Sequence, residues 1–461
     1  MDDAWLEHLE PRVPGGEPAF DRIADAIVRA IADGQLKAGE RLPTHRALAR
    51  RLGVAVPTVT RAYQAAAHRG LVVSATGRGM FVAGIPELRD EQDVSRKLDM
   101  AVNAPARGPH GPALRGALER LSRQPDLHAE LGYAAEIGSA RHRSLAADWL
   151  GRRGVEASHD DIAITHGTQH ALFVAFAAAA HQGGAIATES LTYPGARSAA
   201  QMLGLELVPI AIDGQGLVPD ALARWCRAAA APRVLYTTPF AHNPTARTQS
   251  AQRRRQLVDV ARAHDVTIVE DDVFGLLDES GTPPLAATAP ERTLHVTSVS
   301  KAIAPGLRVG TLAGPSHLMQ RVGPLIRATI FNAAPLQTAI TMAWLEDGTA
   351  DRLVEWQRVQ ARERRECALS LLGECPAVRS LTAAALHVWV ELAPHWSPAE
   401  AIAAAASVDV LIGPTSHFAV GALDERGVRL CLGNAPSVEA LAAALERLDQ
   451  SWRQPFWVSG T

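Results

Sequence analysis

The sequence has little cysteine and no long apolar segment, and both shortages exclude classes of protein. Its four cysteines form no CxxC pair and are too sparse in 461 residues for a disulfide framework. No apolar run approaches the ~18 residues of a membrane-spanning helix. The first residues, MDDAWLEHLEPRV, are acidic, whereas an export signal begins with cationic and then apolar residues. We therefore expect a protein of the reducing cytoplasm, neither exported nor inserted in a membrane.

The chain also lacks a large net charge, a fixed-period repeat and a low-complexity tract; the net charge is only −3. Its charges are nevertheless unevenly distributed. Residues 36–83 hold eight lysines or arginines against one acidic residue, Glu40, so the remainder holds 38 basic and 48 acidic residues. The N-terminal part is therefore basic and the bulk acidic. The length of 461 residues predicts two or three domains.

The basic segment predicts a compact unit of three helices and a hairpin. FDRIADAIVRAIADG is typical of a helix over Phe20–Gly34, and LPTHRALARRLG of a second helix with Thr44 as its N-cap and Gly53 as its stop. A third helix has Pro57 in its first turn and ends at Gly70. Two β-rich runs around a glycine turn follow in LVVSATGRGMFVAG. This order predicts a winged helix-turn-helix.

Such a unit has a defined set of candidate DNA-binding positions. The second helix of a helix-turn-helix lies in the major groove, with residues near its N-terminus at the base edges. An arginine on the preceding helix can meet a phosphate or a guanine, and one at a hairpin tip can enter the minor groove. Ordinary solvated arginines are the alternative, but the charge bias coincides with the helix-turn-helix pattern. The candidates are Arg46, Pro57, Thr58, Thr60, Arg61 and Arg78.

Phe20 to Gly84 resembles the winged-helix domain of the GntR family. The resemblance rests on GQLKAGERLPTHRALARRLGV, TVTRAY and GLVVSATGRGMFV, and covers essentially the whole unit. It implies that double-stranded DNA is a partner. Val56 departs from the pattern, because that family often has a polar or basic DNA-contacting residue there. Readout at this point is expected to be apolar or absent.

The remainder of the chain predicts an α/β domain. The charged stretch IPELRDEQDVSRKL has no clear apolar periodicity, so we interpret residues 85–98 as a linker between domains over residues 15–84 and 99–455. Beyond Asp161, short β-branched runs such as DIAITHG and VTIVEDD alternate with helical stretches, which predicts a mostly parallel sheet flanked by helices. A long helical region is expected from near Pro335, followed by a smaller α+β part.

One lysine, Lys301, stands between small residues in TSVSKAIAPGLRVG, just after a β-rich run. An amine there can hold a carbonyl cofactor as a Schiff base if other groups bind the cofactor's phosphate and tune its ring. For pyridoxal 5'-phosphate these groups are an anion-binding loop, a carboxylate against the pyridine nitrogen and a stacking partner. The chain offers a candidate for each, and no metal site is predicted.

The candidates follow successive predicted strands. THGTQHAL joins a strand to a helix. The backbone N–H groups at the start of this helix can therefore face a phosphate; they belong to Gly167, Thr168 and Gln169. Asp271 ends an apolar strand, where open α/β sheets have their ligand crevice. Asn243 offers an amide to the ring's phenolic oxygen, and Tyr193 a ring for stacking. Each has an ordinary structural alternative, such as a glycine turn, a helix cap or an ion pair.

Taken in order, these motifs resemble the fold-type I aminotransferases from about Leu98 to the C-terminus. The resemblance rests on ITHGTQHAL, ESLTYPGA, TPFAHNPTA, VEDDVFG, SVSKAIAPGLRVG and GVRLCLGN, among others. It implies large and small subdomains and an internal aldimine of pyridoxal 5'-phosphate at Lys301. By the same resemblance, Ser298, Ser300 and Arg308 help hold the phosphate, Tyr133 reaches the cofactor of a partner subunit, and Arg429 clamps a substrate or effector carboxylate.

A winged helix followed by such a domain resembles the MocR/GabR family of bacterial regulators over nearly the full length. The resemblance implies a homodimeric transcription factor whose cofactor-bearing domain senses an amino compound or the cofactor itself. Three residues depart from the aminotransferase pattern: Phe274 replaces a tyrosine, Ala246 a glycine and His142 an apolar residue. Two alternatives stay open, a working aminotransferase with a DNA-binding appendage and a cofactor-free domain that only dimerises.

Overall fold

The computed structural model describes residues 18–32, 35–36, 40–68, 72–75, 79–82, 97–229, 233–421 and 426–453. The chain forms two compact units, one before and one after the boundary between residues 96 and 97. Leu98, which we interpreted as part of the linker, lies in a short strand of the second unit. The limits of the domains stay predictions.

The first unit contains the three helices and the hairpin that the sequence predicts. These are α1 (Ala19–Ala32), α2 (His45–Leu52), α3 (Val56–His68), β1 (Val72–Ala75) and β2 (Gly79–Val82), with the two strands antiparallel. Thr44 caps α2 as expected, because its hydroxyl accepts from the backbone N–H of Ala47 at 3.2 Å. Gly53 ends the helix in the left-handed conformation with a φ of 63°.

The core of this unit is apolar and draws on every element. Ile23 and Ile27 of α1 pack with Leu48 of α2 and Val59 of α3, and all four are buried. Tyr63 is also buried, and its hydroxyl donates to the carbonyl of Pro43 at 2.7 Å. The helical periodicity of the sequence therefore directs one face of each helix inward, which leaves the basic residues outside.

A seven-stranded sheet organises the second unit, in the order β4-β12-β11-β10-β9-β5-β6. Its strands are β4 (Ile162–Thr165), β5 (Ala185–Glu189), β6 (Glu206–Ile210), β9 (Arg233–Thr237), β10 (Val266–Asp271), β11 (Thr293–Ser298) and β12 (Gly310–Ala313). Strand β12 is antiparallel to both neighbours, and the other pairs are parallel. The mostly parallel sheet is thereby confirmed.

Helices cover both faces of this sheet. On β4, Ile162 and Ile164 pack into one apolar cluster and Ala163 into another on the opposite face, so the strand is buried on both sides. The flanking helices are α4 (His110–Ser122), α5 (Ala140–Gly151), α6 (Gly167–Ala179), α7 (Pro194–Met202), α8 (Pro219–Ala228), α9 (Ala251–Ala263), α10 (Leu285–Thr288), α11 (Ser316–Ile330) and α12 (Pro335–Glu346). A two-stranded ribbon joins β7 (Ile212–Asp213) to β8 (Gly216–Leu217).

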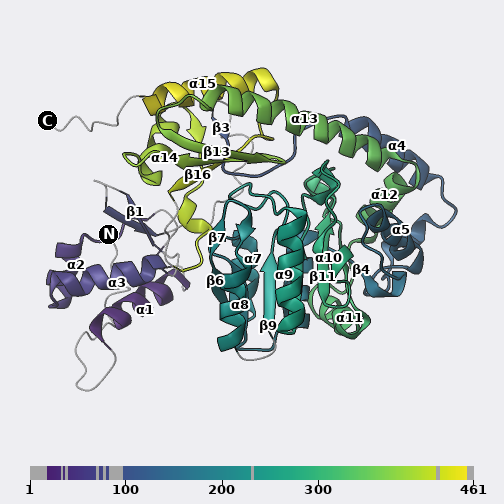
Figure 1. Ribbon diagram of the computed structural model, residues 1–461, viewed down its shortest axis with the longest axis horizontal. Coiled ribbons are helices and arrows are strands. Elements are labelled where there is room, and N and C mark those ends of the chain that lie inside the picture. The colour runs from purple at the N-terminus through teal and green to yellow at the C-terminus, as the bar shows by residue number, and fades with distance from the viewer. Residues whose placement is uncertain are drawn as a thin grey trace. The chain divides into compact units, whose positions relative to one another are not determined.

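The small subdomain has a core of its own. It contains a three-stranded antiparallel sheet of β13 (Val378–Ala384), β14 (His387–Leu392) and β16 (Gly427–Cys431), with helices α14 (Pro398–Ser407) and α15 (Val438–Arg453). Strand β3 (Leu98–Asp99) pairs in parallel with β15 (Val410–Leu411). The long helix α13 (Thr349–Leu372) leads to this subdomain from α12 and runs beside α15 (Figure 1).

The helical region after β12 begins earlier than we expected. Helix α11 starts at Ser316, directly after Pro315, and carries Pro324 in its interior. An interior proline removes a backbone donor and weakens the helical signal of a sequence, which explains why only the later helix from Pro335 was predicted. Within the described ranges, no helix is both long and apolar enough to cross a membrane.

Candidate cofactor and effector site

Lys301 lies at the carboxyl edge of the central sheet, three residues beyond the end of β11. The neighbouring parallel strand β10 ends at Asp271, and β9 leads into the loop that carries Asn243. Because parallel strands end at the same edge, the topology gathers residues that are far apart in the sequence. The site is therefore assembled by the sheet order.

The amine of Lys301 is in a half-buried position and has a protein partner. Its Nζ donates to the backbone carbonyl of Asn103, which belongs to the segment just after β3. The pKa of the Lys301 ammonium is lowered to about 8, chiefly by burial; Arg429 contributes to the lowering, whereas Cys431 and Asp271 oppose it. A larger fraction of this lysine is therefore neutral, and nucleophilic, at physiological pH than of an exposed lysine.

Asp271 is buried, with 4% of its surface exposed, and both of its carboxyl oxygens are engaged. The hydroxyl of Tyr236 donates to Oδ2 at 2.9 Å, and the backbone N–H of Val273 donates to Oδ1 at 3.2 Å. Burial raises the pKa of Asp271 to about 6, although the hydrogen bond from Tyr236 opposes this rise. These two hydrogen bonds fix the orientation of the carboxyl group at the sheet edge, where it can pair with a cation.

Hydroxyl, amide and guanidinium groups converge at the start of α6. The hydroxyl of Thr168 donates to Ser298 Oγ at 2.7 Å, and the backbone N–H of Ser300 donates to the same atom at 3.3 Å. Within the described ranges, the buried hydroxyl of Ser300 has no hydrogen-bond partner. An orphaned hydroxyl beside a helix N-terminus suits a bound anion.

Arg308 and Gly167 approach each other closely in this cluster. Arg308 Nη2 donates to the carbonyl of His166 at 3.4 Å. Gly167 has a φ of +75°, and a Cβ at this position would lie 2.5 Å from Arg308 Nη2. A larger residue would therefore displace the guanidinium. Gln169 lies in the first turn of α6. Its side chain donates to the carbonyl of Gly195 at 2.7 Å, which links α6 to α7.

Arg429 and Asn243, which we assigned to different ligand atoms, contact each other. Arg429 Nη1 donates to Asn243 Oδ1 at 2.6 Å, and Nη2 donates to the carbonyl of Ala101. The guanidinium carbon lies 4.7 Å from the ring centre of Phe418. Arg429 Nε is buried without a partner among the described residues. Arg429 therefore orients the Asn243 amide and retains a free donor.

The two candidate tyrosines differ in their surroundings. Tyr193 is half-buried just before α7; burial raises the pKa of its hydroxyl and the charge of Asp271 adds to the rise, which places it beside the site. Tyr133 is 86% exposed, and its ring centre lies 4.6 Å from that of Phe331. The structure thus does not bring Tyr133 into contact with Lys301 of the same chain.

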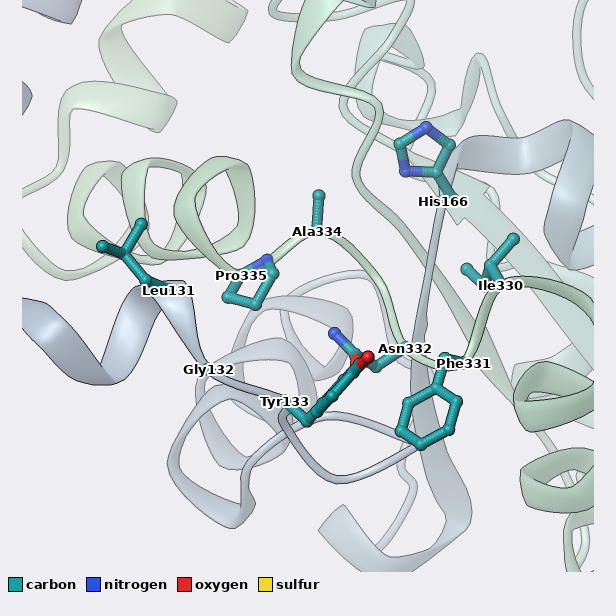
Figure 2. Close-up of a pocket in the computed structure, with 9 residues that line it drawn as sticks. All are labelled: Leu131, Gly132, Tyr133, His166, Ile330, Phe331, Asn332, Ala334 and Pro335. Carbon is teal, nitrogen blue, oxygen red and sulfur yellow. The ribbon is translucent and has the colours of Figure 1, made fainter.

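Tyr133 lines a hollow of about 550 Å³ on the surface of the second unit. Figure 2 shows its ring beside Asn332 and Phe331, with His166 on another side of the hollow. His166 immediately precedes α6, and its carbonyl accepts from Arg308. The hollow therefore borders the cluster of hydroxyl and guanidinium groups at the start of α6.

Sequence reasoning missed several residues of the site. Tyr236 contacts Asp271, Asn103 contacts Lys301, and His387 contacts Asn103. Tyr236 has a sequence signal in retrospect, since it lies one residue before the end of β9, next to the strand of Asp271. Asn103 has none, because it follows a two-residue strand outside every motif. Among the described residues, no group of three or more His, Cys, Asp or Glu side chains is arranged to hold a metal.

Comparison with known proteins connects these features to a family. Residues 20–82 match the bacterial regulatory proteins of the gntR family, and residues 95–448 match aminotransferase class I and II. The chain is 31% identical to the HTH-type transcriptional regulator TauR of Rhodobacter capsulatus, over 77% of this chain and 79% of TauR. The chain belongs to this family of HTH-type regulators with an aminotransferase class I and II domain.

Two further similarities support the same assignment. The uncharacterized HTH-type transcriptional regulator YdeF of Bacillus subtilis is 26% identical, over 93% of each chain. The fold of the second unit is that of an archaeal alanine:glyoxylate aminotransferase, with a TM-score of 0.73 and 21% identity over 79% of this chain and 93% of that one. The predicted winged helix and fold-type I domain are confirmed. The protein is a DNA-binding regulator, and its second domain has a fold that implies dependence on pyridoxal 5'-phosphate.

In this regulator, the DNA-binding candidates among the described residues lie on α2 and α3. Arg46, Pro57 and Arg61 are exposed, and Thr58 and Thr60 are half-buried. The Arg61 guanidinium lies 4.7 Å from the ring centre of Phe20 on α1, so Arg61 already has an intramolecular partner. Val56, which departs from the GntR pattern, begins α3 and is 41% exposed. Arg78 lies outside the described residues.

The departures from the aminotransferase pattern also have structural counterparts. Phe274 is buried, with its ring centre 5.6 Å from that of His387, and it has no hydroxyl to offer. Ala246 is buried at a φ of 54°, a left-handed conformation that costs a non-glycine residue roughly 1–2 kcal/mol. His142 is half-buried on α5, where burial lowers its pKa. Phe274 thus lies against His387, a residue of the Lys301 site.

Proposed function

We propose that this regulator senses an amino compound, or pyridoxal 5'-phosphate itself, at Lys301 and transmits the result to its DNA-binding unit. The observation that carries the proposal is the position of the Lys301 amine. It is half-buried, its pKa is lowered to about 8, and the buried carboxylate of Asp271 lies near it. An amine in this state is suited to capture an aldehyde reversibly.

The residues around Lys301 fit the cofactor. Asp271 would pair with the protonated ring nitrogen, and Tyr193 would stack on the ring. The phosphate would take the orphaned hydroxyl of Ser300 and the N-terminal N–H groups of α6. Further groups would complete this pocket, namely Thr168, Ser298, Arg308 and the backbone of Gly167 and Gln169. When bound, the cofactor supplies an aldehyde that can exchange one amine for another.

The ligand that exchanges with Lys301 is proposed to carry a carboxylate. Arg429 supports this assignment, because it is buried in the site and its Nε has no partner among the described residues. A guanidinium with a free donor binds a carboxylate in a directed way. Asn243, oriented by Arg429, would then present its amide nitrogen to the ring's phenolic oxygen.

An active aminotransferase with a DNA-binding unit is the second candidate. The set of Lys301, Asp271 and Arg429 favours it, since all three would be needed for turnover. Phe274 argues against an active aminotransferase, because the side chain at this position has no hydroxyl to bond the cofactor's phenolic oxygen. Multiple turnovers of an amino donor to a keto product would favour the enzyme, and a single half-reaction the sensor.

The regulator is further proposed to act as a homodimer on two half-sites. A helix-turn-helix dimer reads half-sites whose spacing follows from protein geometry. Tyr133 is exposed in a hollow that borders the start of α6, where it is available to a second copy of the chain. Reaching the cofactor of that copy is the role that its family resemblance implies.

A combined titration tests this function. Purified protein would be loaded with pyridoxal 5'-phosphate, and its visible absorption followed as amines and amino acids are added. In parallel, fluorescence anisotropy would measure affinity for operator DNA, because a regulatory ligand must bind two states of the protein with different affinity. Protein that stays colourless with the cofactor would contradict the proposal, and so would spectral changes that leave DNA affinity unchanged.

A further inference from the structure

The segment that first follows the unit boundary runs through the Lys301 site. We call residues 98–104 the bridging segment. Its strand β3 pairs with β15, and the carbonyl of Met100 accepts from the backbone N–H of Cys431 at 2.9 Å. Asn434 donates to the carbonyls of Asp99 and Val102, at 3.0 and 2.9 Å. The segment is thereby anchored to the small subdomain.

Two other carbonyls of the bridging segment are held by the two cationic groups of the site. The Ala101 carbonyl accepts from Arg429 Nη2, and the Asn103 carbonyl accepts from Lys301 Nζ. Lys301 belongs to the large subdomain and follows β11. The Asn103 contact therefore joins the two subdomains through the amine that we propose for cofactor capture.

The side chain of Asn103 is fixed in one orientation. His387 Nε2 lies 3.1 Å from the carbonyl of His242, which can only accept, so Nε2 carries the proton. His387 Nδ1 is then an acceptor, because burial and the charge of Arg429 keep the pKa of His387 at about 3 and the ring neutral. The amide nitrogen of Asn103, 3.2 Å away, must donate to it. Asn103 is thus anchored at both its side chain and its carbonyl.

We propose that Asn103 is a positioning residue for the Lys301 amine, and that bond formation at this amine releases the bridging segment. The inference rests on the proposed function. Condensation with an aldehyde forms a C=N bond and removes two amine hydrogens with the aldehyde oxygen as water. An ammonium has three N–H donors, whereas the product retains one at most. The new bond fixes the direction of any N–H that remains, so the Asn103 carbonyl is expected to lose its donor, and the chain leading to the DNA-binding unit one of its anchors.

Hydrogen exchange measured on the bridging segment tests the release. Wild-type protein would be compared alone, with pyridoxal 5'-phosphate, and with 4-deoxypyridoxine 5'-phosphate, which has the same ring and phosphate but no aldehyde. We expect exchange over residues 97–106 to rise several-fold with the aldehyde and to stay unchanged with the analogue. Unchanged exchange despite a visible absorption band would overturn the inference alone. Absence of the band would instead contradict the proposed function.

The pH dependence of aldehyde capture tests the positioning role. Charged or titratable groups face Lys301 from several elements: Asp271 of β10, Arg429 and Cys431 of β16, and Arg308 after η6 (Pro305–Leu307). A carbonyl acceptor stabilises the ammonium form, so its loss lowers the pKa of Lys301 below about 8. Capture requires the neutral amine. Asn103→Ala keeps the backbone carbonyl but removes the side-chain hydrogen bond to His387 that holds this carbonyl in place. The carbonyl can then move away from Lys301 Nζ, so the rate of band formation should reach half its maximum at a lower pH than in the wild type, by up to about one pH unit, or roughly a tenfold change in the deprotonation equilibrium.

Asn434→Ala is the matched control, because Asn434 holds the same segment but does not touch Lys301. Its pH profile should match that of the wild type. Equal shifts in the two variants, or none in Asn103→Ala, would overturn the positioning role. Asn103→Leu keeps a side chain of similar size but removes the donor to His387 without adding a charge, and it should shift the profile in the same direction as Asn103→Ala. It keeps the test decisive if the alanine variant does not fold.

Discussion

The two units of this regulator place their polar groups in opposite ways. In the first unit, an apolar core that includes Ile23, Leu48 and Val59 leaves the arginines of α2 and α3 outside. In the second, the ionisable groups of Asp271 and Arg429 are buried among sheet and loop residues. DNA recognition needs accessible cations that meet phosphates, whereas a small-molecule site needs groups that are taken out of water.

This difference predicts how each unit responds to substitution. Burial lowers the pKa of Lys301 to about 8 and raises that of Asp271 to about 6, so both groups have properties that no exposed residue would have. A change at either residue removes a function that has no substitute nearby. Exposed arginines on a DNA-binding face act more additively, and one loss weakens binding by a limited factor.

Lys301→Ala is expected to have the largest effect. Without the amine no covalent capture is possible, so the visible band with pyridoxal 5'-phosphate should be absent, and DNA affinity should no longer respond to the cofactor. Absorption spectra and fluorescence anisotropy measure the two results, and circular dichroism checks the fold. A Lys301→Ala protein that kept the visible chromophore would show that the cofactor is held elsewhere or without a Schiff base.

Asp271→Asn should weaken cofactor binding by roughly tenfold to a hundredfold, the range expected for one lost hydrogen bond to a charged group. Tyr236→Phe is the graded comparison. It removes a donor to Asp271, so the pKa of Asp271 should rise above about 6. As the pH is lowered, the cofactor affinity of this variant should therefore begin to fall at a higher pH than that of the wild type. Equilibrium titrations between pH 5 and 8 measure both. Equal affinity in wild type and Asp271→Asn would remove Asp271 from the site.

Arg46→Ala should weaken DNA binding by about tenfold and reduce the salt slope by about one, as for one lost phosphate contact. Arg61→Ala should have a smaller effect on affinity, because the Arg61 guanidinium lies over Phe20. Anisotropy titrations at several salt concentrations compare the two variants. Neither should change the cofactor spectrum, and a changed spectrum would contradict the separation of the two units.

Tyr63→Phe is expected to have the smallest effect. It deletes only the hydroxyl that donates to the Pro43 carbonyl and should lower the free energy of unfolding of the first unit by about 1 kcal/mol. Thermal unfolding followed by circular dichroism measures the change. Cofactor binding should be unaltered, since Tyr63 belongs to the core of the first unit. Loss of cofactor binding in this variant would argue against independent units.

Local sequence was a good guide where the physics is local. Thr44 and Gly53 begin and end α2 as predicted, because a side-chain cap and a left-handed glycine act over a few residues. The strands of the central sheet were recognisable from their β-branched runs. Helix α11 was missed, because Pro324 interrupts its pattern. Within the site, Lys301, Asp271, Asn243 and Arg429 could be singled out, but Tyr236 and Asn103, which contact Asp271 and Lys301, could not.

By itself, the sequence determined the order of the two domains, the periodicity of their elements and the lysine on which the proposed sensing depends. Only the tertiary structure decided that Lys301 meets Asn103, which is 198 residues away in the sequence, and that Arg429 meets Asn243. The physical reason is that hydrogen bonds between distant segments depend on sheet order and on the packing of the two subdomains. Neither leaves a periodic signal in the chain.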